Sequence, residues 1–226
     1  MFIRKSHQSE IMDDFSITDD RIDLALKELK TINKYLGGNS TTKDGIIRLM
    51  RNINSTGKLN ILDIGAGGSD NLQINKNEWG EVQVTCLDIN TRTCRYIRNK
   101  SKEDNIICGD AFNIPFKKSS FDIVHASLFL HHFSDNDIKK ILKSCLDISK
   151  HGIIINDLQR SVLAFAGIKL LTFLFSQSIM VRNDAPLSVK RGFLKSELIK
   201  ILSEIKCASL ILKSKWAFRW LVVIIK

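Results

Sequence analysis

The chain is poor in the residues that mark several kinds of protein. Only Pro115 and Pro186 interrupt its 226 residues, and no internal repeat or low-complexity tract divides it. The five cysteines form no Cys-x-x-Cys pair, so we predict reduced, buried thiols and no metal site. The first 15 residues contain no continuous apolar run, so no signal peptide is predicted. These absences predict one folded domain that works in the cytoplasm.

Negative charge is scarce in one part of the chain. Residues 1–138 carry 18 basic and 19 acidic side chains, whereas residues 139–226 carry 16 basic and 5 acidic side chains. The net charge of the whole chain is +10. A basic half favours an acidic partner, either nucleic acid or an anionic membrane surface. The alternative is a solvated basic face that has no partner.

Short apolar segments alternate with helical patterns along the chain. Helical spacing of apolar residues extends over residues 17–52. Five strands are then predicted, at residues 60–64, 82–88, 105–108, 121–126 and 152–157. Strands that alternate with helices form a parallel sheet covered on both faces, and ligands bind at the carboxyl ends of its strands. Two later runs, residues 207–213 and 216–225, are separated by two residues only, which predicts an antiparallel hairpin.

The sequence ILDIGAGGSDNL, residues 61–72, places a glycine loop directly after the first strand. A dinucleotide would require Gly-x-Gly-x-x-Gly here, but Asp70 stands at the third glycine position, where a carboxylate repels a pyrophosphate. Asp63, Gly65 and Gly67 instead form Asp-x-Gly-x-Gly, which resembles motif I of the class I S-adenosylmethionine-dependent methyltransferases. Because that ligand carries an ammonium and a sulfonium group and no phosphate, a nearby carboxylate favours it.

Carboxylates also follow the second and third strands. Asp88 ends the second strand, where it can accept hydrogen bonds from both hydroxyls of a ribose. Asp110 belongs to GDAFNIPF, which together with Phe121 and Asp122 resembles a later pattern of the same family. The resemblance implies that Asp110 and the amide of Ala111 bind the adenine, and that the cofactor is S-adenosyl-L-methionine. The predicted cofactor-binding residues are Asp63, Gly65, Ala66, Gly67, Asp88, Ile89, Asp110, Ala111 and Ser127.

The resemblance also implies the architecture. It is an α/β fold with a Rossmann-like sheet of seven mostly parallel strands, an antiparallel last strand and helices on both faces. We expect one methyltransferase domain over residues 1–226. Its parts are a helical cap (1–57), a cofactor-binding core (58–157), a hydrophobic lid and acceptor region (158–205) and a C-terminal hairpin (206–226). The segments SEIMDD, NKYLGG and NDAPLSVKRGF resemble a bacterial subgroup of small-molecule methyltransferases related to quinone-biosynthesis and natural-product enzymes.

Two adjacent histidines follow the fourth strand, in HASLFLHHFSD. Histidine suits proton transfer near neutral pH, so His131 and His132 are predicted at the mouth of the cleft. Related small-molecule O-methyltransferases are thought to use such a pair, with an aspartate after the fifth strand, as base and orienter. The resemblance therefore implies that His131 or His132 acts with Asp157. The alternative is a histidine that only packs or caps the next helix, and His125, within the fourth strand, is predicted to be a core residue.

Residues 162–181 are predicted to form an apolar helix between the fifth and sixth strands. Such a helix must be covered, and Lys169 near its middle argues against a membrane span. A hydrophobic lid at this place in the fold indicates a lipophilic acceptor, for which we predict contacts with Arg160, Phe165 and Arg191, and a peripheral position at an anionic membrane surface. A homodimer interface and plain core are the alternatives for this helix.

These inferences predict methyl transfer from S-adenosylmethionine to a small, lipophilic acceptor. Oxygen is preferred over carbon as the acceptor atom because of the histidine pair. The alternatives are a methyltransferase that acts on RNA or another nucleic acid, and a non-catalytic partner protein that binds the methyl donor. Enzymes that methylate amino groups of bases usually carry a tetrapeptide like Asn-Pro-Pro-Tyr after the fourth strand. HASLFL contains no proline, so no nucleic-acid partner is expected.

Overall fold

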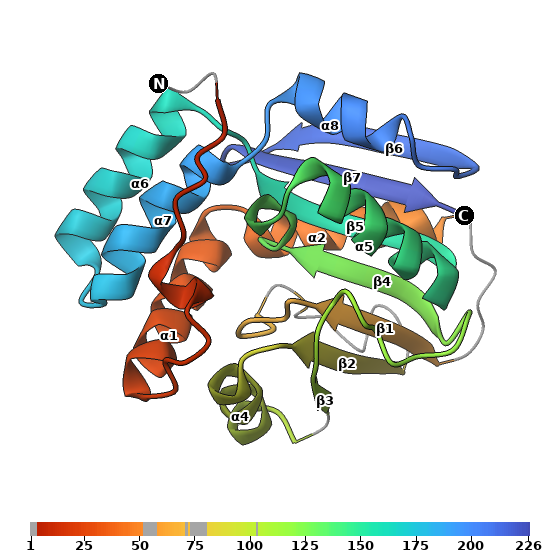
Figure 1. Ribbon diagram of the computed structural model, residues 1–226, viewed down its shortest axis with the longest axis horizontal. Coiled ribbons are helices and arrows are strands. Elements are labelled where there is room, and N and C mark those ends of the chain that lie inside the picture. The colour runs from red at the N-terminus through yellow and green to blue at the C-terminus, as the bar shows by residue number, and fades with distance from the viewer. Residues whose placement is uncertain (1–3, 52–57, 71, 73–80, 103) are drawn as a thin grey trace.

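A computed structural model describes residues 4–51, 58–70, 72, 81–102 and 104–226. Seven strands form one sheet in the order β3-β2-β1-β4-β5-β7-β6 (Figure 1). The strands are β1 (Leu59–Ile64), β2 (Val82–Asp88), β3 (Asn105–Cys108), β4 (Phe121–Ser127), β5 (Ser149–Leu158), β6 (Ser209–Lys215) and β7 (Arg219–Ile225). Strands β1 to β5 pair in parallel, and β7 runs antiparallel to both β5 and β6. The predicted fold class is confirmed.

The strands are apolar on both faces because both faces are covered. Ile61 of β1 belongs to one buried cluster, and its neighbours Leu62 and Ile64 belong to another on the opposite face. None of these three side chains is exposed to solvent. This is why the sequence shows continuous apolar runs here and not an apolar and polar alternation.

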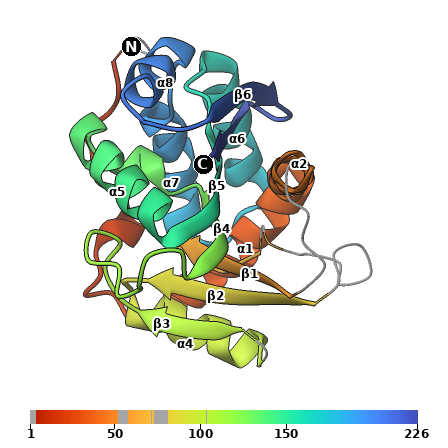
Figure 2. The same cartoon turned by 90° about the vertical axis from the view of Figure 1, so that its right-hand side faces the viewer.

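Helices cover both faces of the sheet and also its end. They are α1 (Asp20–Tyr35), α2 (Gly38–Met50), α4 (Thr91–Lys100), α5 (Asp135–Ile148), α6 (Val162–Phe175), α7 (Ile179–Arg191), α8 (Lys195–Leu202) and the short 3-10 helices η1 (Ile11–Asp13) and η2 (Leu130–His132). Figure 2 shows α5 and α2 on opposite sides of the central strands. In Figure 1, α1, α6 and α7 are grouped beyond the carboxyl end of β4. These three helices enclose the edge of the sheet where a ligand is expected.

The turn of the C-terminal hairpin differs from the prediction. The sequence placed it at residues 214–215, but β6 continues through Lys215 and the turn occupies residues 216–218. The turn docks onto the end of α1, where a Cβ atom on Gly37 would lie only 1.8 Å from the carbonyl oxygen of Trp216. This tertiary contact, which the local pattern does not show, places the turn after β6 and not within it.

The apolar segment 162–181 is not one helix, as the sequence predicted, but the whole of α6, a break at residues 176–178 and the start of α7. Glu28 of α1 stabilises the break, because its carboxylate accepts hydrogen bonds from the amides of Gln177 and Ser178 at 2.7 and 3.1 Å. The Ser178 side chain then caps the N-terminus of α7. Within the part of the chain that the structure describes, no helix is both long and apolar enough to cross a membrane.

The expected subdivision of the domain stays a prediction. Residues 1–3 and 52–57, at the two ends of the expected helical cap, lie outside the described residues.

Candidate active site

A cavity of about 800 Å³ lies beside the carboxyl ends of β1, β2, β3 and β4. The loops that follow these strands form one wall, and α1, α6, α7 and the turn after β6 form the others. Its volume lies in the upper part of the range for ligand pockets, roughly 300–1,000 Å³. The cavity therefore has room for more than one small molecule.

The glycine loop after β1 exposes its backbone to this cavity. Gly65 and Gly67 have φ values of 59° and 52°, in the left-handed region that glycine tolerates best. A Cβ atom on Gly65 would lie 2.0 Å from the ring of Phe129, whereas one on Gly67 would meet no atom within 4 Å. Gly65 is therefore required by close packing, and the backbone at Gly67 is open for a ligand to approach.

Asp63 lies beneath this loop and does not line the cavity. It is only 3% exposed, and its Oδ1 lies 2.7 Å from Nδ1 of His125. The hydroxyl of Ser69 donates to its Oδ2 over 3.3 Å. Asp63 therefore shapes the glycine loop from below, while its predicted contact with the cofactor stays a prediction.

A chain of buried polar side chains links Asp63 to the helix that covers the cavity. His125, which is fully buried as the sequence predicted, has its Nε2 3.0 Å from the hydroxyl of Thr42. Asn156 donates to that hydroxyl over 3.1 Å and accepts from Arg219 over 3.2 Å. Arg219 also donates to Asn33 of α1 over 2.8 Å, and burial lowers the pKa of Arg219 to about 10. The chain connects the glycine loop with α1 through the interior.

Asp88 lines the cavity at the end of β2. One of its oxygens accepts from the amide of Gly67 and the other from the amide of Asn90, each over 2.9 Å. Burial raises the pKa of Asp88 to about 6, so the carboxylate is charged at neutral pH. Since a carboxylate oxygen can accept more than one hydrogen bond, both oxygens retain capacity for ribose hydroxyls. Ile89, which is 44% exposed, stands next to it in the wall.

The ends of β3 and β4 complete this wall. Asp110, Ala111 and Ser127 all line the cavity. Asp110 accepts from the amide of Phe112 over 2.9 Å and from the side chain of Asn113 over 3.1 Å, which fixes its carboxylate in a turn. All the predicted cofactor-binding residues except Asp63 thus share one wall. An open glycine backbone and two carboxylates fit a cofactor that is positively charged and carries no phosphate.

Asp70 also lines the cavity, but its charge is compensated. It is 6% exposed, it bonds to the ammonium group of Lys100, and Nζ of Lys30 lies 3.7 Å away. Both partners are distant in sequence. Asp70 therefore presents less negative charge to a ligand than the sequence indicated. The missing third glycine is the feature that distinguishes this loop from a dinucleotide-binding loop.

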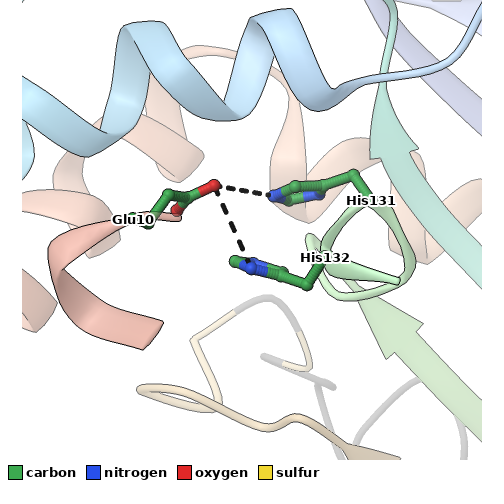
Figure 3. Close-up of side chains that lie close together, drawn as sticks. All are labelled: Glu10, His131 and His132. Atoms are coloured by element: carbon green, nitrogen blue, oxygen red, sulfur yellow. Dashed lines mark ion pairs between the residues drawn. The ribbon is translucent and has the colours of Figure 1, made fainter. Parts of the chain in front are cut away.

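The opposite wall carries a cluster of ionisable side chains around the histidine pair (Figure 3). His131 is 1% exposed, and its Nδ1 lies 2.7 Å from Oδ1 of Asp157. Oε1 of Glu10 lies 3.6 Å from Nε2 of His131 and 4.0 Å from Nδ1 of His132. Oδ1 of Asp13 lies 2.8 Å from the same Nδ1 of His132. We call Glu10, Asp13, His131 and His132 the histidine cluster.

Arg191, the last residue of α7, holds the two acidic members of this cluster. Its Nη1 lies 2.5 Å from Oδ2 of Asp13 and 3.4 Å from Oε1 of Glu10. Its Nη2 donates to the carbonyl oxygen of His132 over 3.0 Å. Arg191 lines the cavity, as predicted for a substrate contact, although its charge is already paired with these carboxylates.

The electrostatics of the cluster favour positive charge on His131. Burial alone would lower its pKa, but the attraction of Asp157 and Glu10, together with the hydrogen bond to Asp157, outweighs burial and raises that pKa to about 9. Burial alone would raise the pKa of Glu10, yet His131, His132 and Arg191 hold it below its usual value. The pKa of Asp13 is also lowered, because the contacts with His132 and Arg191 outweigh its burial. The cluster therefore provides a negative field at its nitrogen atoms.

Like Asp63, three of the predicted catalytic and substrate residues do not line the cavity. Asp157 is not on the rim but is 1% exposed behind His131, where it also accepts from the amides of Leu130 and His131. Arg160 is buried and pairs with Glu197, because the strand end turns it away from the cavity. The ring of Phe165 lies beneath the ammonium group of Lys190, 4.7 Å away. The sequence correctly grouped residues that follow strands but did not show which way each side chain points.

Glu10 and Asp13 were missed by the sequence reasoning. They belong to SEIMDD, which was noted only as a resemblance, and they lie more than 100 residues from the histidines. The spacing of three residues between two acidic side chains, just before the first helix, is the one signal in the sequence that could have drawn attention to them. The segment reaches the site because the amides of Ile11 and Met12 donate to Asp184 of α7, at 2.8 and 3.0 Å.

Comparison with known proteins agrees with this geometry. Residues 61–152 match the protein family described as "Methyltransferase domain". A demethylmenaquinone methyltransferase of Thermotoga maritima is 26% identical over 121 residues, which are 53% of this chain and 51% of the relative. The match thus spans about half the length of that curated relative.

Solved structures share the fold at low sequence identity. The plantazolicin methyltransferase BpumL in complex with SAH has a TM-score of 0.66 and 15% identity, with 96% of this chain and 98% of that chain covered. A SAM-dependent methyltransferase from Aquifex aeolicus has a TM-score of 0.60 and 14% identity, with 88% and 96% covered. At this identity the structures show the fold alone.

The predicted family, fold and cofactor are confirmed by the domain match, the curated relative and the sheet topology taken together. The wall formed by the glycine loop, Asp88 and Asp110 contains the residues predicted to bind S-adenosylmethionine, and we call it the donor wall. Residues 61–152 therefore carry a methyltransferase domain, and the chain has the fold of the class I S-adenosylmethionine-dependent methyltransferases.

Proposed function

We propose that this protein transfers the methyl group of S-adenosylmethionine to a small, lipophilic acceptor, with oxygen as the preferred acceptor atom. The observation that carries the proposal is the cavity itself. One cavity of about 800 Å³ is lined by the donor wall, by the histidine cluster and by apolar side chains of α1, α6 and α7. An acceptor with an apolar body and one polar group would place that group at the cluster.

Different residues of the chain bind the methyl donor and take part in proton transfer. S-adenosylmethionine supplies a methyl carbon that is already activated by its positive sulfur. Asp88 and the open backbone at Gly67 hold and orient the methyl donor, and the apolar walls exclude water from the reacting atoms. A hydroxyl acceptor must lose its proton, and His132, with a 23% exposed side chain, is the ring of the pair more accessible for that step. Asp157 positions His131 through its Nδ1.

The lid supports a lipophilic acceptor. Ala164, Gly167 and Ile168 of α6 line the cavity. Facing away from the protein, α6 and the start of α7 expose a group of apolar side chains, each more than half exposed, that we call the α6 patch: Val162, Leu163, Leu170, Phe173, Leu174, Phe175 and Ile179. Leu163 belongs to both surfaces. We propose that this patch rests on an anionic membrane surface, attracted by the basic C-terminal half, so that a lipophilic acceptor passes beside α6 into the cavity.

The names of relatives also support a small-molecule acceptor. One relative is a demethylmenaquinone methyltransferase and another is the plantazolicin methyltransferase. Neither name identifies the acceptor of this chain, because the first match covers about half of the relative and the second is 15% identical.

The proposal is tested in two steps. Calorimetric titration with S-adenosylhomocysteine should show one site per chain. Incubation of the protein and S-adenosylmethionine, labelled with ¹³C in its methyl group, with an organic-solvent extract of cells should then give a labelled product in mass spectrometry. The ¹³C chemical shift of that product distinguishes an O-methyl from a C-methyl group. Labelled RNA without a labelled extractable product would contradict the proposal.

The membrane surface is tested separately with vesicles. Phe173→Ser combined with Leu174→Ser should reduce cosedimentation with vesicles of phosphatidylserine and phosphatidylcholine. The matched control, Ile199→Ser with Leu210→Ser, removes two exposed apolar side chains of α8 and β6 and should bind like the unaltered protein. Equal binding by both variants would exclude the α6 patch as the membrane contact.

A further inference from the structure

The histidine cluster contains an arrangement that proton transfer alone does not explain. Glu10, His131 and His132 each present an atom that can bind a metal ion, and these three atoms all lie within 4.8 Å of one another. Figure 3 shows the carboxylate of Glu10 pointing at both rings, from a segment that is remote in sequence. All three residues line the cavity.

Two nitrogen atoms at the centre of this arrangement lack a hydrogen-bond partner in the described part of the chain. They are Nε2 of His131 and Nδ1 of His132, and both are buried from solvent. The contact of His132 with Asp13 is short, at 2.8 Å, but it is an ion-pair contact and not a hydrogen bond. The carboxylates of Glu10 and Asp13 compensate these nitrogens by charge alone, and a ligand between the rings would bond to both.

The distances suit a metal ion. Zinc bound by nitrogen and oxygen at 2.0–2.2 Å in a tetrahedron places neighbouring ligand atoms roughly 3.3–3.6 Å apart. The Glu10 oxygen lies 3.6 Å from His131 Nε2 and 4.0 Å from His132 Nδ1. All three ligand atoms lie within 4.8 Å of one another, so an ion would draw the side chains together by up to about an ångström.

The surroundings also resemble the support that metal ligands receive. A histidine that binds a metal usually donates its other ring N–H to a carboxylate, which fixes the ring. His131 has this arrangement, because its Nδ1 lies 2.7 Å from Asp157 while Nε2 faces the cluster. Glu10, Asp13 and Asp157 supply three negative charges, and Arg191 supplies one positive charge next to Glu10 and Asp13. The excess of negative charge favours a divalent cation.

We propose that Glu10, His131 and His132 form a binding site for a divalent transition-metal ion, of which Zn²⁺ and Fe²⁺ best match two imidazoles and one carboxylate. Three protein ligands leave coordination positions for a further molecule, and the ligands line the cavity. If the proposed function holds, on which this chemical role rests, the ion would bind the acceptor oxygen and lower the pKa of its hydroxyl. The histidines would then act as ligands and not as bases.

The test uses the whole 226-residue chain and metal ions without any other ligand. After dialysis against a chelator, Co²⁺ is titrated and the visible absorption of the cobalt is recorded, and Zn²⁺ binding is measured by calorimetry. We expect one strong site per chain, with the absorption of four- or five-coordinate cobalt. Glu10→Gln and His132→Asn should each weaken binding by at least about 100-fold, beyond the 10–100-fold typical of outer-shell changes.

Two control variants keep the test specific. His151→Asn removes a histidine outside the cluster, and Cys108→Ser removes an exposed thiol, so both should bind metal like the unaltered protein. If the cluster variants also bind metal normally, the ion binds elsewhere and the proposed site is excluded. Absence of cobalt absorption from the unaltered protein would exclude it equally.

Titration with S-adenosylhomocysteine separates this proposal from the proposed function. Binding of that compound by the cluster variants shows that they are folded, since the donor wall contains none of the altered residues. Normal binding of the compound without metal binding would refute the metal site and leave the methyltransferase proposal intact. Metal binding without any methylated product would leave the metal site in place and contradict the proposed function.

Discussion

The donor wall and the histidine cluster line the same cavity but are assembled in different ways. The residues of the donor wall lie between positions 65 and 127, and each lies at or just after the carboxyl end of a parallel strand. A parallel sheet brings such positions together at one edge. The cluster combines residues 10 and 13 with the η2 turn, and it depends on contacts with Asp157 of β5 and Arg191 of α7. The first arrangement follows from the topology, and the second follows from particular side-chain contacts.

The largest expected effect separates chemistry from binding of the methyl donor. Changing His131→Asn together with His132→Asn should lower turnover by about 10²–10⁴-fold, which is the usual contribution of proton transfer by a positioned side chain. Affinity for S-adenosylhomocysteine should change by less than about twofold, because the donor wall is not touched. An asparagine at 131 retains an N–H group near Asp157, so the aspartate is not left buried without a partner.

Steady-state turnover and calorimetry on the same preparation check this double variant. Unaltered turnover would remove both histidines from the mechanism. A loss of donor affinity equal to the loss of turnover would show that the two walls are not independent.

The next largest effect is a loss of affinity for the methyl donor. Asp88→Ala should weaken binding of S-adenosylhomocysteine by about 10–100-fold, since a hydrogen bond to a charged group contributes about 1.5–3 kcal/mol. Metal binding by the histidine cluster should not change. An unchanged dissociation constant in calorimetry would refute the ribose role of Asp88.

Asp88 also predicts a pH dependence. With its pKa raised to about 6, the carboxylate is charged above that pH and protonated below it, so affinity for S-adenosylhomocysteine should fall as the pH decreases below about 6. The folded-state pKa exceeds the ordinary value of an aspartate, so the folded protein binds the proton more tightly than the unfolded chain. The contribution of Asp88 to stability therefore increases as the pH falls from about 6 to 4. Asp88→Ala should remove both dependences, and their persistence would assign them to another group.

Much of the fold and of the donor wall was predictable because the relevant information is local. Every strand was found within a few residues, and Gly65, Gly67, Asp88 and Asp110 all lie at or just after strand ends. The role of Asp63 beneath the loop was not predictable, because it depends on His125 of the neighbouring strand. In a parallel sheet a sequence shows the order of strand ends but not the rotation of each side chain.

What could not be predicted depends on contacts between distant segments. The break between α6 and α7 requires Glu28 of α1, and the compensated charge of Asp70 requires Lys100. The histidine cluster requires Glu10, which has no helical or strand pattern around it. None of these pairings leaves a periodic signal in the sequence.

Substitution of Asp122 should have a moderate effect on stability and leave both the donor wall and the histidine cluster intact. Asp122 was part of the family pattern, yet it accepts from the amide of Asn60 over 2.7 Å and from Lys150 over 2.8 Å, away from the cavity. Asp122→Ala should lower the free energy of unfolding by about 1–3 kcal/mol, because a buried amide loses its partner. Asp122→Asn, which keeps an acceptor oxygen, should lower it less. Denaturant unfolding checks the order, and a loss of donor affinity in either variant would contradict a purely structural role.

The smallest effect concerns a residue predicted to contact substrate. Phe165→Leu should change turnover and the acceptor KM by less than about twofold, since the ring lies against Lys190 and does not line the cavity. Loss of the contact between cation and ring should cost only about 0.5–1 kcal/mol of stability. A fivefold increase in the acceptor KM, measured with the labelled product, would indicate that Phe165 contacts the acceptor.

The buried polar chain from Asp63 to Asn33 has a consequence for local unfolding. It joins the glycine loop, four neighbouring strands and two helices into one cooperative unit, because no member can leave without stranding a polar group in the interior. The N-terminal segment is outside that unit, and the amides of Ile11 and Met12 are held by a single carboxylate of Asp184. In native-state hydrogen exchange these two amides should therefore exchange long before those of β1 and β4. The acceptor side would open in events that leave the methyl donor in place.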